Sequence, residues 1–258
     1  MPLSDAELDR YARHIVLPHI GGAGQARIKA ARILIIGAGG IGSIVIPALA
    51  ASGIGMMRVV DDDTVSLSNL QRQTLFATAD IGRPKVTVAA ERVAALNPHV
   101  MVETHALRVN ATTIPPLLSG VDMVIDGSDN FATRLAVSDA ATAAHVPLVS
   151  AAIAQFQGQV GSFTGWLADK PCYRCFVGDA HDPDANDTEN CDSCAEQGVL
   201  GAMVAMVGGF AAMEALRLIV GYGEDAAGKL HVIDGLGPTW RTMRLPKDPG
   251  CRGCSGCG

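Results

Sequence analysis

The sequence has few charged residues, no excess of positive charge and no hydrophobic run long enough to span a membrane. Charged residues make up 18% of the 258 positions and hydrophobic residues 48%, which argues against a disordered chain and predicts a substantial core. The net charge of −6 argues against nucleic acid or an anionic membrane as the main partner. The longest apolar run, residues 198–213, is shorter than the about 18 residues of a membrane span and predicts a buried or dimer-interface helix.

Two further features are missing. The charged N-terminus is not followed by the apolar core of a signal peptide, so a cytoplasmic protein is expected. The chain also has no internal repeat of solenoid length. Its seven cysteines are therefore expected to serve metal or thiol chemistry rather than disulfide bonds.

Hydrophobic runs alternate with helical patterns over the first 150 residues. Strands are predicted near 32–36, 56–60, 100–105, 121–126 and 146–151, and helices near 5–14, 42–52, 82–96 and 131–145. This alternation predicts an α/β fold with a Rossmann-like, doubly wound, mostly parallel sheet. After Gln155 we expect a more exposed strand over 157–164 and an antiparallel pair over 229–235 and 239–245.

A glycine motif follows the first predicted strand. The stretch ILIIGAGGIG has the spacing G-x-G-x-x-G, with Gly37, Gly39 and Gly42, and Asp61 follows 19 residues later. Such a turn points helix N-terminal amides at a phosphate, and an acid at this distance can bind a ribose. The motif alone predicts a nucleotide and leaves open which one.

The segment 61–85 departs from the dehydrogenase pattern, which needs one carboxylate for the ribose. It contains further acids together with Asn69, Arg72 and Lys85, and the sequence DGSDN at 126–130 adds carboxylates at the end of another strand. Cations that hold phosphates and a carboxylate that holds a metal suit a magnesium-bound triphosphate better than a nicotinamide dinucleotide.

Motifs along nearly the whole chain, from about residue 7 to 254, resemble those of one family. They are RYARHIVLP, GAGGIGS, DDDTVSLSNLQRQTLF, IGRPKV, ALNPHV, DGSDNFATR, PLVSAA, GQV, PCYRC, AMEALRL and DPGCRGC. In this order they resemble the MoeB/ThiF/HesA family, the sulfur-carrier-protein adenylyltransferases of the ubiquitin-activating enzyme superfamily.

The resemblance implies an activity and its partners. ATP would adenylylate the C-terminal Gly-Gly carboxylate of a small β-grasp carrier (MoaD- or ThiS-like), with release of pyrophosphate, in molybdopterin or thiamin biosynthesis. A homodimer, a separate sulfur-donor protein and the cofactors ATP, Mg²⁺ and Zn²⁺ are implied as well. We expect one ThiF-type domain over 1–258, with a nucleotide-binding half to about 154 and a carrier-docking, zinc-stapled half from about 155.

The resemblance also assigns site residues. The implied nucleotide-binding set is Gly40, Asp61, Ser68, Asn69, Leu70, Gln71, Arg72, Lys85, Ser128 and Asp129. Asp61 would bind the ribose, and Arg72 and Lys85 would contact the phosphates. Asp129 would bind magnesium. Arg72, Lys85 and Asp129 are thus implied catalytic residues, together with Arg13, which would act across a dimer interface, and Cys194, a loop thiol that is reactive in some members and dispensable in others.

The other cysteines form knuckles. Cys172-x-x-Cys175 and Cys251-x-x-Cys254 are separated by 75 residues and would complete a tetrahedral zinc site, which would staple the tail to the preceding loop. A redox-active pair is the alternative. Cys257 makes an overlapping C-x-x-C with Cys254, which leaves the fourth ligand open, although Cys251 and Cys254 are favoured. The resemblance adds weight to zinc.

Three other functions compete. A related enzyme that adenylylates a peptide or tRNA-linked carboxylate would have the same ATP site. An NAD-dependent oxidoreductase would bind NAD and would not exchange pyrophosphate. A zinc-stapled binding scaffold would carry a relic ATP site, which the intact set of Arg72, Lys85 and Asp129 argues against.

Overall fold

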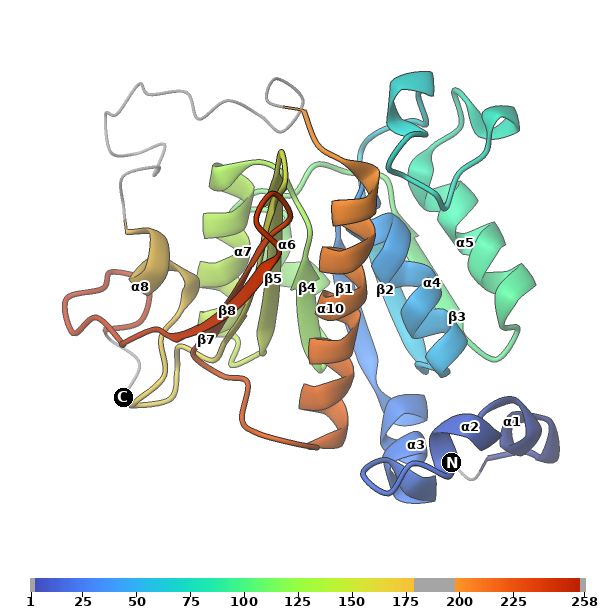
Figure 1. The fold of residues 1–258 in the computed structure, drawn as a ribbon, viewed down its shortest axis with the longest axis horizontal. Helices are drawn as coiled ribbons and strands as arrows, with labels where there is room; N and C mark the ends of the chain where they lie inside the picture. The colour runs from blue at the N-terminus through green and yellow to red at the C-terminus, as the bar shows by residue number, and fades with distance from the viewer. Residues whose placement is uncertain (1–2, 179–197, 256–258) are drawn as a thin grey trace.

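The computed structural model describes residues 3–178 and 198–255, which form one eight-stranded sheet with helices on both faces (Figure 1). The strands are β1 Arg32–Ile36, β2 Met56–Val60, β3 Met101–His105, β4 Met123–Asp126, β5 Leu148–Ala154, β6 Gln157–Phe163, β7 Lys229–Asp234 and β8 Thr239–Arg244. Their order is β3-β2-β1-β4-β5-β6-β7-β8. Strands β3 to β5 in this order pair in parallel, and β5 to β8 pair antiparallel. The predicted fold class is confirmed.

Helices connect and cover the strands. They are α1 Asp5–Arg10, α2 Ala12–Ile15, α3 Gly21–Ala30, α4 Gly42–Ser52, α5 Lys85–Leu96, α6 Ile114–Leu117, α7 Phe131–Ala143, α8 Tyr173–Val177 and α10 Gly201–Val220, with short 3₁₀ turns η1 Leu67–Asn69 and η2 Thr78–Asp80. In β1, Ile33 and Ile35 pack in the core with α4 and α10, whereas Leu34 and Ile36 pack on the other face with α6 and α7. Cover on both faces is what a parallel sheet requires.

Helix α10 covers the middle of the sheet. Among the described residues it is the one helix long and apolar enough to cross a membrane by length and composition, yet 56% of its most apolar window is buried. It packs against α4, β5 and β6 (Figure 1). Glu214 is 1% exposed and pairs with Arg217 at 2.8 Å. The apolar run over 198–213, predicted as a buried or dimer-interface helix, belongs to a partly buried helix that begins at Gly201 and ends at Val220.

The helix predicted over 5–14 is instead two helices that break at Tyr11. The ring of Tyr11 is 2% exposed, and its hydroxyl oxygen accepts a hydrogen bond from Nδ2 of Asn97 at 2.8 Å. Gly53, which has a φ of +83°, makes room for this ring, because a side chain there would collide with it. Burial of one tyrosine thus bends the segment and leaves Arg13 exposed.

The expectation of a more exposed strand over 157–164 is wrong. Strand β6 is buried at Gly158 and from Val160 to Phe163 because it lies between β5 and β7. On one face, Val207 of α10 fills the space beside Gly158. The ring of Phe163 packs edge-on against Tyr173, with ring centroids 5.6 Å apart. Gly158 and Gly161 of this strand allow close packing rather than exposure.

Candidate functional site

The carboxyl ends of β1, β2 and β4 meet where the strand order reverses, and a cavity of about 410 Å³ lies there. Its wall consists of the turn after β1, the residues after β2, the segment 69–73, the start of α5 and the loop between β4 and α7. Open α/β sheets place their ligands at this crevice, and the volume is that of a small-molecule site.

The turn after β1 brings backbone N–H groups to the cavity. Gly37 has a φ of +89°, in the left-handed region that favours glycine. A side chain on Gly42 would collide with the carbonyl group of Gly37, so α4 begins close against the end of β1. Gly40 lines the cavity just before this helix. The start of α4 therefore lies at the cavity, and a helix N-terminus in such a position can bind phosphate.

Asp61 closes the other side of the glycine turn. Its Oδ2 accepts the N–H of Ala38 at 2.7 Å, and its Oδ1 accepts the N–H of Asp63 at 2.8 Å. Burial raises the pKa of Asp61, whereas the Lys85 ammonium and these N–H groups oppose the rise. Each carboxylate oxygen retains a second lone pair, so Asp61 can still accept hydrogen bonds from ribose hydroxyls.

Lys85 enters the cavity from the start of α5. It is 3% exposed, and its Nζ lies 2.8 Å from Oδ2 of Asp63, whose side chain is 71% exposed. The backbone N–H of Lys85 donates to the carbonyl of Asp63 at 3.0 Å, and Val65 donates to Arg83 at 2.9 Å. These bonds join the segment after β2 to the start of α5. An ammonium has three donors, so Lys85 can hold a phosphate oxygen while it keeps Asp63.

Asn69, the last residue of η1, and Arg72, in the segment that follows, line the cavity. Nη1 of Arg72 donates to the carbonyl of Ser68 at 3.1 Å, and the backbone carbonyl of Arg72 accepts from Oγ of Ser43 at 3.4 Å. No carboxylate pairs with Arg72 in the described part of the chain. Its positive charge is therefore available to a phosphate.

Three residues of the expected nucleotide-binding set do not line the cavity: Ser68, Leu70 and Gln71. Ser68 is exposed, and Leu70 packs against the core beneath α4 and α10. The carbonyl of Gln71 lies against Gly201 at the start of α10. They shape the segment that carries Arg72, and a direct contact with nucleotide stays a prediction for each.

The loop between β4 and α7 carries Ser128 and Asp129, which both line the cavity. The side chain of Asp129 is exposed and has no hydrogen bond or ion pair within residues 3–178 and 198–255. Asp126, at the end of β4, is 0% exposed, and burial raises its pKa against the opposing charge of Arg134. A free carboxylate beside a phosphate cradle is a suitable magnesium ligand.

Two buried polar atoms of residues that line the cavity have no hydrogen-bond partner in the described structure. They are Oε1 of Gln73 and Oγ of Ser128. Gln73 is 4% exposed and lies over Gly39, within 3.7 Å of the point where a Cβ would stand. A buried polar atom without a partner is costly, so these atoms fit a site that a polar ligand completes.

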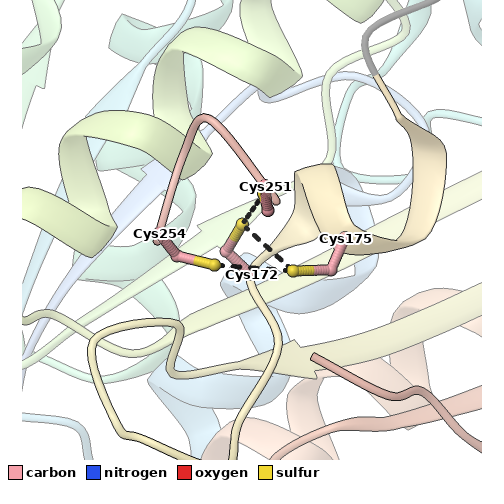
Figure 2. Close-up of side chains that lie close together, drawn as sticks. All are labelled: Cys172, Cys175, Cys251 and Cys254. Atoms are coloured by element: carbon pink, nitrogen blue, oxygen red, sulfur yellow. Dashed lines mark hydrogen bonds between the residues drawn. The ribbon is translucent and has the colours of Figure 1, made fainter. Parts of the chain in front are cut away.

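Four cysteines come together (Figure 2) beside the second half of α7, where Tyr173 donates its N–H to Oγ of Ser138 and Arg174 pairs with Asp139. The sulfur atoms of Cys172, Cys175, Cys251 and Cys254 lie within 4.8 Å of one another. Three of the sulfur–sulfur distances are 3.5, 3.5 and 3.8 Å. Sulfurs held about 2.3 Å from one zinc ion stand about 3.8 Å apart. The predicted four-cysteine cluster is therefore present and is consistent with zinc.

Without a cation, burial disfavours the thiolate form at two of these cysteines. Burial raises the pKa of Cys172, and it raises the pKa of Cys254 to about 11. For Cys175 burial is outweighed by N–H groups such as that of Asp248, which lies 3.5 Å from the sulfur, and its pKa is lowered. Several thiolates so close together are stable only with a positive ion between them.

Comparison with known proteins identifies the family of this chain. The ThiF family model matches residues 11–253. This chain belongs to the ThiF family. A sulfur carrier protein adenylyltransferase of Thermus thermophilus is 43% identical over 251 residues, which cover 96% of this chain and 91% of the relative. From Escherichia coli, a molybdopterin-synthase adenylyltransferase is 38% identical and a ThiS adenylyltransferase 37% identical, each with 98% of both chains covered.

A crystal structure of E. coli MccB has the same ThiF-like fold. Its TM-score is 0.82, with 23% identity, and the match covers 96% of this chain and 75% of MccB. At this identity the likeness shows the fold alone.

Two further predicted site residues are Arg13, which lies away from the cavity, and Cys194, which is not among the residues that the structure describes. Arg13 is exposed on α2, and α1 to α3 lie below the sheet at the end where β1 begins, whereas the cavity lies at the end where β1 stops (Figure 1). Arg13 therefore does not reach the cavity of its own chain. Cys194, like Cys191 and Cys257, lies outside the described residues.

The ThiF cavity also has wall residues that the sequence did not single out. Gln73 directly follows Arg72, and Arg134 is 6% exposed in the first turns of α7. A helical signal existed for Arg134, because it lies four residues after Asn130 and therefore on the same side of the helix. Arg108 also lines the cavity. It follows β3 in an irregular segment, so no periodic pattern in the sequence indicated its position.

Proposed function

We propose that this ThiF-family chain is an ATP-dependent adenylyltransferase that activates the C-terminal Gly-Gly carboxylate of a small ubiquitin-like sulfur carrier, in molybdopterin or thiamin biosynthesis. The observation that carries the proposal is the convergence of the glycine turn, Arg72, Lys85 and Asp129 on one cavity. The names of the relatives support the class of substrate. A soluble, cytoplasmic enzyme and a separate sulfur-donor protein belong to the same proposal.

The reaction is a substitution at the α-phosphorus of ATP. An oxygen of the carrier's terminal carboxylate attacks the α-phosphorus, the bond to the β-phosphate oxygen breaks, and pyrophosphate leaves with its electron pair. The product is an acyl-adenylate. Attack of one anion on another requires charge neutralisation and alignment. The amides before α4, Arg72 and Lys85 would neutralise the phosphates, and Asp61 would orient the nucleoside by its ribose.

Two metal ions fit the residues present. Asp129 would hold magnesium, which neutralises charge on the phosphates when bound; the exposed carboxylate without a partner supports this role. Cys172, Cys175, Cys251 and Cys254 would hold zinc, and the sulfur–sulfur distances support it. The zinc would have a structural role, because four protein ligands leave no position open for a substrate.

The carrier would dock on the far part of the sheet, within the half that begins near residue 155. Strand β8 is the edge of the sheet, and all of its residues are exposed. Leu236, Trp240 and Met243 expose 72%, 47% and 45% of their surfaces. An edge strand flanked by exposed apolar side chains is suited to another protein. The division into two functional halves stays a prediction.

The decisive experiment is ATP–pyrophosphate exchange with candidate carriers. We expect exchange with a MoaD- or ThiS-like carrier and none with the same carrier lacking its last glycine, because the carboxylate would then end short of the α-phosphorus. Exchange that persists without that glycine would contradict the mechanism. Exchange without any carrier, but with a peptide or tRNA-linked carboxylate, would support the alternative substrate class, and NAD binding without exchange would support an oxidoreductase.

We also propose that the enzyme is a homodimer in which Arg13 completes the cavity of the partner. Arg13 is exposed and lies at the end of the sheet opposite to its own cavity. Leu8, Val16 and Leu17 of the same N-terminal segment expose 45%, 71% and 47% of their surfaces. Apolar side chains clustered at a surface indicate a contact with another chain.

Mixing two inactive variants would test this arrangement. Arg13→Ala and Asp129→Ala should each abolish exchange alone. In a mixed dimer, the cavity of the Arg13→Ala subunit keeps its own Asp129 and receives Arg13 from the other subunit. One of the two cavities of the dimer is therefore active. With half of the dimers mixed, about a quarter of the native activity should return. A mixture that stays as inactive as its components, after verified subunit exchange, would exclude a contribution from the partner.

A further inference from the structure

Arg134 is a buried cation that has no role in the proposed reaction. It is 6% exposed, belongs to α7 and lines the cavity. Its Nη2 donates hydrogen bonds to the carbonyl oxygen of Ser128 and to that of Ala151, the latter at 3.2 Å. The side chain therefore joins the loop after β4 to strand β5. Removing a guanidinium from water costs free energy, so a buried arginine with such contacts is expected to have a structural or functional role.

The backbone on both sides of Asp129 is fixed. Gly127 donates its N–H to the carbonyl of Ile36 at 3.0 Å, and Ser128 donates to Oδ1 of Asp126 at 2.9 Å. After Asp129, the side chain of Asn130 caps α7 by accepting the N–H of Thr133 at 3.0 Å. The Asp129 carboxylate itself has no hydrogen bond or ion pair in the described part of the chain.

The charges around the loop give Arg134 a second effect. Asp126 is 0% exposed, and its Oδ2 has no hydrogen-bond partner among the described residues. Asp129 repels this carboxylate and Arg134 attracts it. Without Arg134, two carboxylates three positions apart would repel each other in a loop that had also lost the contact to its Ser128 carbonyl.

We propose that Arg134 is a positioning residue that holds the Ser128 carbonyl and compensates Asp126, so that the Asp129 carboxylate is directed at a divalent cation. This inference rests on the proposed magnesium role of Asp129. It assigns Arg134 no contact with the nucleotide or the carrier. In metal sites, residues that orient a ligand in this way typically change metal affinity by about 10- to 100-fold when they are removed.

Direct binding of Mn²⁺ to the full-length protein tests the inference. Electron paramagnetic resonance would count free Mn²⁺ in a titration with a non-hydrolysable ATP analogue, and no turnover is needed. We expect Arg134→Met to weaken Mn²⁺ binding by about tenfold or more. Arg134→Lys should lose less, since it keeps the positive charge and loses the two-carbonyl geometry.

Arg58 offers a matched control. It is a largely buried arginine, with a side chain 12% exposed, and its Nη1 donates to the carbonyls of Leu117 and Ser119 at 2.6 and 3.0 Å. Arg58 also pairs with Glu103 at 2.7 Å. None of these residues lines the cavity. Arg58→Met should therefore lower the melting temperature without changing the Mn²⁺ affinity. An equal loss of affinity in Arg58→Met would reduce the effect to general destabilisation and overturn the inference.

Asp129→Ala in the same titration separates the two proposals. If it binds Mn²⁺ as tightly as the native protein, the magnesium role of Asp129 is wrong and the inference falls with it. If it binds weakly while both Arg134 variants, shown to be folded by circular dichroism, bind normally, only the inference is wrong. Should Arg134→Met fail to fold, the affinity of Arg134→Lys decides the question, and a native value contradicts the inference.

Discussion

Asp129→Ala should reduce ATP–pyrophosphate exchange by at least about 100-fold, the scale expected when a charge-stabilising group is removed from the reacting phosphates. The fold should not change. The Asp129 side chain is exposed and has no partner in the described structure, and substitutions of such residues alter stability by at most about 0.5 kcal/mol. Exchange kinetics and a thermal melt of the same preparation measure the two effects.

Asp62→Ala is the matched control for that experiment. Asp62 is also an exposed acid in the cavity wall, and no role is assigned to it. Its removal takes away the same charge, so retained exchange would show that Asp129 acts as a specific ligand and not only through the field of the cavity. Near-native exchange in Asp129→Ala would refute the magnesium assignment, whereas a large fall in melting temperature would mean that Asp129 supports the fold.

The parts of the site that could be predicted depend on local sequence or on sheet topology. A strand followed by Gly37, Gly39 and Gly42 has few conformations available, because the turn needs a positive φ and close approach to the next helix. Arg72 and Asp129 are 57 residues apart in sequence. They line one cavity because parallel strands end at the same edge of the sheet.

The parts that could not be predicted are contacts between distant segments. Lys85 lies beside Asp63 because the backbones around them pair, and neither residue has a periodic pattern that indicates a partner. The contact between Arg134 and the carbonyls of Ser128 and Ala151 involves backbone atoms, which every residue has. Residue types therefore gave no signal for it.

Burial was misjudged where polarity was taken as exposure. The segment 157–164 is predicted as a more exposed strand, yet Gly158 is buried, with Val207 of α10 in the space beside it. Ser68, Leu70 and Gln71 were grouped with Arg72 by the family motif, although a short 3₁₀ turn directs only part of that motif into the cavity. Side-chain direction in irregular segments depends on tertiary packing, which sequence spacing does not determine.

Loss of the zinc that we propose for the cysteine cluster should have the largest effect on stability. Structural zinc contributes about 10 to 16 kcal/mol to the folding of small zinc domains. Here the cluster joins α8 to the chain near residue 250, and three of its four cysteines are buried. If even about 4 kcal/mol of this is lost, Cys251→Ser should lower the melting temperature by roughly 10 °C. A strong chelator should have the same effect on the native protein, and metal analysis should show the loss of one zinc per chain.

Cys257→Ser separates the two candidate fourth ligands. The described cluster contains Cys251 and Cys254, and their sulfurs lie 3.5 Å from those of Cys172 and Cys175 respectively. Cys257→Ser should therefore retain zinc and the native melting temperature, while Cys251→Ser loses both. The zinc content should also fall as the pH is lowered, because protons compete for thiolates, and the raised pKa values of Cys172 and Cys254 make this competition strong. Zinc loss in Cys257→Ser with retention in Cys251→Ser would instead place the overlapping pair, Cys254 and Cys257, in the site.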